Sequence, residues 1–103
     1  HKMRAFEDLK FVNTKIPKGI QSVVGFGDSY QLSIIKNSTS YGGQQGLYEI
    51  GVFKDGDMVE MPGITEEGDS VKGWLSESDI SGIIKKMHLA TGSEPKQVDI
   101  QPE

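Results

Sequence analysis

The sequence predicts an α+β fold: a four-stranded antiparallel sheet made of two hairpins, with one C-terminal helix packed on one face. Two pairs of β-rich runs flank short turns, and a run with helical apolar spacing follows them. The 103 residues include no cysteine, so we expect one hydrophobic core that is held together without disulfides.

The first hairpin is predicted from "IQSVVGF" and "YQLSIIK", which are separated by the three residues "GDS". A three-residue loop places Phe26 opposite Tyr30 and Val24 opposite Leu32. This register gathers apolar side chains on one side of the strand pair.

The second hairpin is predicted from "GLYEIGVFK" and the Asp-Gly turn that follows it. In this register Val52 lies opposite Val59 and Ile50 lies opposite Met61. We expect the hairpin to end at Pro62, because proline has no N–H to donate to a strand ladder.

The helix is predicted over residues 77–89, with Ser76 as its N-cap, Asp79 at N3 and Gly92 as its stop. Its apolar residues follow helical spacing, and we expect them to pack on one face of the sheet. The helical stripe is Ile80, Ile83, Ile84 and Met87, and the receiving face is Val24, Leu32, Ile34, Tyr48, Ile50 and Val52.

The two ends of the chain show weaker secondary-structure patterns than the segments between them. Residues 3–12 are predicted to form either a short helix or an edge strand, and 3–90 to form a single domain. Residues 91–103 are polar, and we expect a flexible tail there. We expect His1 and Lys2, which precede Met3, to be expression-tag residues.

Composition limits the function classes. The chain is 35% hydrophobic and 25% charged, which is typical of a soluble globular protein, and no apolar run approaches the roughly 20 residues that span a bilayer. The absence of cysteine fits a reducing cytoplasm. We therefore expect no membrane partner.

The net charge of −4 is unevenly distributed. Residues 1–54 carry seven Lys/Arg and four Asp/Glu, whereas 55–79 carry eight acids and one lysine. No basic stripe with interleaved aromatics is present, so we expect no nucleic-acid partner. The acidic segment, with Glu66, Glu67 and Asp69 at its centre, is predicted to face a basic partner or to mimic DNA; the alternative is a solvated surface.

The segment "SYGGQQG" resembles a phosphate-binding loop only superficially. Its glycines, Gly42 and Gly43 among them, lead into a strand instead of a helix, and no lysine follows them. We interpret the segment as a long connection between the hairpins. Tyr41 at its tip is a candidate interface anchor, with packing back on the sheet as the alternative. Trp74 is predicted to close the edge of the core, with an interface anchor as the alternative.

Catalytic patterns are absent from the sequence. His88 stands beside the apolar helical stripe and outside any cluster of titratable residues, and no serine lies in a nucleophile-elbow motif. The acids do not follow the spacing of a calcium loop. We therefore expect no enzyme activity, no metal and no cofactor.

Four segments give a resemblance that covers most of residues 3–88: "FEDLKFV", "GIQSVVGFGDSYQLSII", "SYGGQQGLYEIGVFKDGDM" and "GWLSESDISGIIKKM". The chain resembles small uncharacterised accessory proteins of tailed bacteriophages and prophages. The resemblance implies the cytoplasm of a bacterial host and an accessory role, such as host takeover or anti-defence, exerted by binding host factors.

Two function hypotheses follow. The first is a non-enzymatic protein that binds a host protein through the acidic segment, the Tyr41 loop or a sheet edge. The alternative is a small-ligand or nucleotide-binding module, in which the glycine-rich loop encloses an anion with Lys36 and Lys54. Self-association into a homo-oligomer stays open under both hypotheses.

Overall fold

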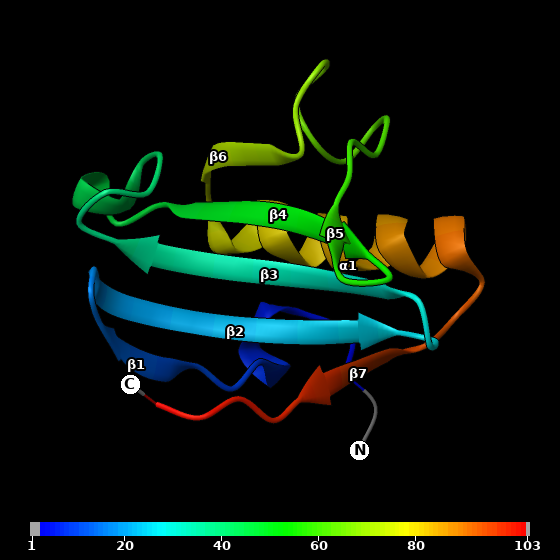
Figure 1. The fold of residues 1–103 in the computed structure, drawn as a ribbon, viewed down its shortest axis with the longest axis horizontal. Helices are drawn as coiled ribbons and strands as arrows, with labels where there is room; N and C mark the ends of the chain where they lie inside the picture. The colour runs from blue at the N-terminus through cyan, green and yellow to red at the C-terminus, as the bar shows by residue number, and fades with distance from the viewer. Residues whose placement is uncertain (1–2, 103) are drawn as a thin grey trace.

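A computed structural model describes residues 3–102 of the chain, so the expected tag residues His1 and Lys2, and residue 103, lie outside the described range. One helix lies across one face of an antiparallel sheet (Figure 1). The predicted α+β class is therefore confirmed. The predicted strand number is wrong, because the sheet has seven strands instead of four.

Of the short helix and the edge strand considered for residues 3–12, this segment contains a three-residue helical turn, and the edge strand begins only at its last residue, Val12. In chain order the elements are η1 (Phe6–Asp8), β1 (Val12–Lys15), β2 (Lys18–Phe26), β3 (Tyr30–Asn37), η2 (Gly43–Gln45), β4 (Tyr48–Lys54), β5 (Asp57–Met58), β6 (Val71–Leu75), α1 (Glu77–Thr91) and β7 (Pro95–Val98).

Strands β2, β3 and β4 form the centre of the sheet, and two short strands share each outer edge (Figure 1). On one side β1 and β7 both pair with β2; on the other side β5 and β6 both pair with β4. The register of the first hairpin is confirmed, with Phe26 opposite Tyr30 and Val24 opposite Leu32.

The second hairpin is shorter than predicted. Its strand β5 ends at Met58, and Ile50 pairs with Lys72 of β6 instead of Met61. A local turn diverts the chain, because the backbone N–H groups of Ile64 and Thr65 both donate to the carbonyl of Met61 at 2.9 Å. This turn brings Ile64 into the core. Beyond the short strand β5, the edge of β4 then pairs with β6.

The segment predicted as a flexible tail contains β7, which pairs with β2 along residues 95–98. Gln97 fixes this strand through its side chain. Its Nε2 donates to the hydroxyl of Ser22 at 3.0 Å and to the carbonyl of Val23 at 3.2 Å, and its Oε1 accepts from the N–H of Lys10 at 2.9 Å. Polar side chains thus join β7, β2 and the N-terminal segment.

The predicted contact between helix and sheet is confirmed, because all ten residues predicted to make it lie in one buried cluster. At the start of α1, Ser76 Oγ accepts from the N–H of Asp79 at 3.1 Å, and the Asp79 carboxylate accepts from the N–H of Ser76 at 3.0 Å. Gly92 ends the helix in the left-handed region, at φ 71°. No helix in the described part of the chain is long and apolar enough to cross a membrane.

The capping box makes the start of the helix sensitive to acid. The backbone N–H of Ser76, then its hydroxyl and the charge of Lys72, lower the pKa of Asp79 below its usual value of 3.8. A carboxyl group whose pKa is lowered by folding stabilises the folded state above its unfolded pKa. The contribution of this cap is therefore lost as the pH falls through the lowered pKa.

We predict that Ile84→Ala lowers the free energy of unfolding by about 2–5 kcal/mol, because it opens a cavity in the packed core. Leu89→Ala is the matched control on the same helix, since Ile84 is 1% exposed and Leu89 is 70% exposed. Urea melts measure both variants. Equal effects of the two substitutions would show that the helix buries a different face.

We also predict that Gln97→Ala destabilises the protein by about 1–3 kcal/mol, because the hydroxyl of Ser22, which is 0% exposed, loses its donor. Gln31→Ala, at an exposed position on β3, is the control and should change stability by less than about 0.5 kcal/mol. A melt of Gln97→Ala that overlays the wild type would mean that β7 is dispensable.

Candidate functional site

A β-bulge positions Trp74 at the edge of the sheet. Tyr48 pairs with Leu75 while Ile50 pairs with Lys72, so two residues of β6, Gly73 and Trp74, lie opposite the single residue between them on β4. Trp74 takes the left-handed conformation at φ 60°. Few residues other than glycine adopt this region, and a bulky side chain is strained in it.

The Tyr41 loop packs directly against this bulge. The N–H of Trp74 donates to the carbonyl of Tyr41 at 3.1 Å. A Cβ atom on Gly73 would collide with Cβ of Tyr41, and a Cβ atom on Gly42 would lie 3.0 Å from Cα of Trp74. The glycines thus allow two backbone segments, about thirty residues apart in sequence, to touch.

The two aromatic side chains of this contact extend into solvent. Tyr41 is 58% exposed and Trp74 is 60% exposed. Trp74 therefore does not close the core edge as predicted, and Tyr41 does not adopt the alternative considered for it, packing back on the sheet. Both side chains are exposed. We call Tyr41 and Trp74 the aromatic ridge.

A shallow groove of about 390 Å³ runs beside the ridge, between β6 and the first turns of α1. Trp74, Lys72 and Lys86 are among the residues that line it, and the Nζ of Lys86 donates to the carbonyl of Gly63 at 3.2 Å. Glycines line the groove from both sides, at Gly63, Gly73 and Gly82. The backbone is therefore accessible next to the exposed indole.

Five backbone N–H groups of the glycine-rich loop are already bonded within the chain. The N–H of Gly43 donates to the carbonyl of Ser40 at 3.0 Å, and the N–H of Tyr41 donates to the carboxylate of Glu49 at 2.7 Å. Further N–H groups donate to carbonyls of the same loop, those of Gln45, Gly46 and Leu47. A phosphate cradle needs unpaired N–H groups that converge, and it does not tolerate a carboxylate among them. The loop geometry opposes phosphate binding.

The two lysines expected around an anion do not meet at the loop. Lys54 pairs with Tyr30 at one end of β3, whereas Lys36 lies six residues along that strand, about 20 Å away. Each ammonium group lies over a different ring: Lys36 Nζ is 5.0 Å from the centroid of Tyr48, and Lys54 Nζ is 5.5 Å from that of Tyr30.

The acidic residues of the candidate site form a separate patch. Glu66, Glu67 and Asp69 are exposed in the loop that precedes β6, where the N–H of Asp69 donates to the carbonyl of Glu66 at 2.9 Å. The N–H of Glu66 donates to the carbonyl of Val71, the first residue of β6, and Trp74 follows three residues later, about 10 Å along the strand. The structure thus joins Tyr41, Gly42 and Trp74, and leaves the acids at the other end of β6.

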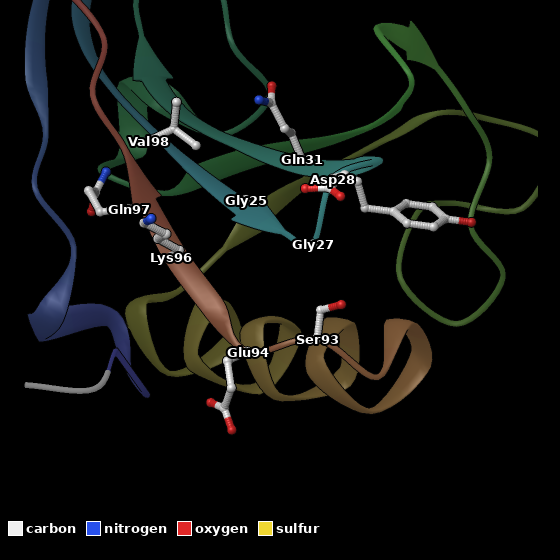
Figure 2. Close-up of a pocket in the computed structure, with 10 residues that line it drawn as sticks. Gly25, Gly27, Asp28, Gln31, Ser93, Glu94, Lys96, Gln97 and Val98 are labelled. Atoms are coloured by element: carbon white, nitrogen blue, oxygen red, sulfur yellow. The ribbon is translucent and has the colours of Figure 1, made fainter.

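A polar pocket of about 660 Å³ lies where the β2–β3 turn meets the start of β7 (Figure 2). Asp28, Glu94 and Lys96 bring charges of both signs to it, and it contains no histidine. His88 lies outside the pocket, where its Nδ1 donates to the carbonyl of Ser93 at 2.8 Å. Within residues 3–102, no group of three or more His, Cys, Asp or Glu is placed to hold a metal.

Comparison with known proteins gives no match to this chain among protein-family models, curated proteins or solved structures. Its function must therefore be argued from the geometry of its own surface. The aromatic ridge is the feature that combines exposed apolar area with a rigidly held backbone.

The left-handed backbone at Trp74 gives a prediction that separates the cost of backbone strain from the effect of losing the indole side chain. Trp74→Gly should be more stable than Trp74→Ala by about 1 kcal/mol, because both variants remove the indole but only glycine adopts φ 60° without strain. Guanidinium melts measure the difference. Two variants of equal stability would show that residue 74 is not held in the left-handed region in solution.

Proposed function

We propose that this protein is a non-enzymatic binding protein that recognises another protein through the aromatic ridge. The observation that supports it is the exposure of Tyr41 and Trp74, both more than half exposed, on backbone segments locked together by a hydrogen bond and two glycine contacts. Tryptophan and tyrosine are enriched among the residues that dominate binding energy at interfaces. A rigid backbone reduces the entropy lost when such residues are immobilised by a partner.

Strain at Trp74 supports a binding role more strongly than exposure alone. Left-handed residues other than glycine cost of order 1–3 kcal/mol and cluster at functional sites. Glycine at position 74 would remove that cost, and the indole contributes little to the core because it is 60% exposed. A tryptophan here is therefore better explained by contact with a partner than by folding.

The acidic loop is assigned a second role in the same interaction. Exposed charges accelerate the encounter of two proteins more than they strengthen the final complex. The partner we propose therefore has an apolar pocket for the ridge and a basic surface about 10 Å away from it, the separation set by β6. The resemblance to phage accessory proteins supports a protein of the bacterial host as this partner, in a host-takeover or anti-defence role in the host cytoplasm.

Affinity capture from bacterial lysate tests the role of the ridge. Wild-type protein, Tyr41→Ala with Trp74→Gly, and the control Leu89→Ala are immobilised in equal amounts, and bound proteins are quantified by mass spectrometry. We expect a protein that is retained by the wild type and the control, and lost from the ridge variant. A captured set that is identical for all three baits would exclude the ridge as the binding surface.

Binding kinetics with the captured partner separate the two surfaces. Reversal of Glu66, Glu67 and Asp69 to lysine should slow association about tenfold or more, with a reduced dependence on salt. Trp74→Ala should instead accelerate dissociation, at a cost of about 2 kcal/mol or more in binding. An association rate that the triple reversal leaves unchanged would assign the acids to solvation alone.

A further inference from the structure

A basic pocket lies at the β1–β2 hairpin. This hairpin is at the opposite edge of the sheet from β6 and the acidic loop before it (Figure 1). Its volume is about 550 Å³. Three lysines line it, Lys15, Lys18 and Lys36, together with Asn13, Thr14, Gly19 and Ile20. None of these lining residues, all within the described range, is acidic, although the chain as a whole has a net charge of −4.

The strand register places the three lysines on one face of the sheet. Lys15 lies directly opposite Lys18, and Lys36 lies directly opposite Ile20. Ile20 and Lys18 are two residues apart on the same strand, so their side chains share a face. Val24, four residues after Ile20 on β2, is on the same face and is buried in the core. The lysines therefore lie on the helix-bearing face of the sheet, beyond the part that α1 covers.

Lys36 is held in position by the hydrophobic core. Its Nζ lies 5.0 Å from the ring centroid of Tyr48, and that ring packs against Phe6 and Phe11 with centroids 5.1 and 5.7 Å away. A cation over an aromatic face loses rotational freedom before any ligand arrives. The pocket therefore presents one ordered ammonium group, that of Lys36, beside Lys18 of the hairpin.

We propose that this pocket binds a small phosphate-bearing anion with more than one negative charge. Lys18 and Lys36 each bring N–H donors and a compact positive charge, which suits phosphate oxygens without a fixed fork geometry. A volume of about 550 Å³ fits the size range of small-molecule sites. The acidic loop on the opposite edge repels anions there and makes the lysine edge the favoured approach. The proposal is independent of the aromatic ridge.

Titration with tripolyphosphate and with ATP, followed by amide NMR chemical shifts and calorimetry at low salt, tests the proposal. We expect shifts confined to residues 13–20 and the neighbourhood of Lys36, and an affinity that falls as salt is added. Equal affinity for both probes would assign recognition to the phosphates alone, whereas tighter ATP binding would assign part of it to the nucleoside.

Two variants with the same change in net charge locate the site. Lys18→Gln with Lys36→Gln should weaken binding about tenfold or more, because two charge-assisted contacts are lost. Lys85→Gln with Lys96→Gln, at exposed lysines elsewhere, should leave the affinity within about twofold. The proposal is overturned if neither probe binds, or if both double variants weaken binding equally.

Discussion

The burial of one stripe of α1 against one face of β2, β3 and β4 determines where every other residue of the sheet points. Because side chains alternate along a strand, a slip of one residue would expose the whole buried set. The helix stripe matches a face whose members Leu32, Ile34 and Ile50 are fully buried. This alternation directs Lys18 and Lys36 to the helix-bearing face, and the bulge in β6 is the local departure from it that sets Trp74 at the edge.

Sequence patterns predicted the parts of the fold whose signals are local. The first hairpin follows from a three-residue turn between two β-rich runs, and the start of α1 follows from Ser76 and Asp79 within one turn of each other. The edge strands β6 and β7 were missed because their evidence is distant. "PKQV" has no apolar alternation, and its stability depends on the contact of Gln97 with Ser22, 75 residues away.

The contacts within the candidate site, like the edge strands, could not be predicted from local sequence patterns. The sequence indicated three residues of the site individually: Tyr41, Gly42 and Trp74. It could not predict that they are in contact, because the contact joins a loop to a β-bulge, and no local sequence pattern predicts that bulge. The close backbone packing that the glycines allow can be seen only in the folded structure. A tryptophan in the left-handed region contradicts local propensity, and such conflicts are expected where function opposes stability.

The pairing of β7 with β2 has a consequence for synthesis of the chain. Strands β2, β3 and β4 are complete once residue 54 has been made. The edge of β2 that faces away from β3 along residues 23–26, however, has no partner until residues 95–98 leave the ribosome. An unpaired strand edge is a template for pairing with other chains. The nascent protein therefore passes through a stage that is open to aggregation, and that stage lasts longer when translation of the second half is slow.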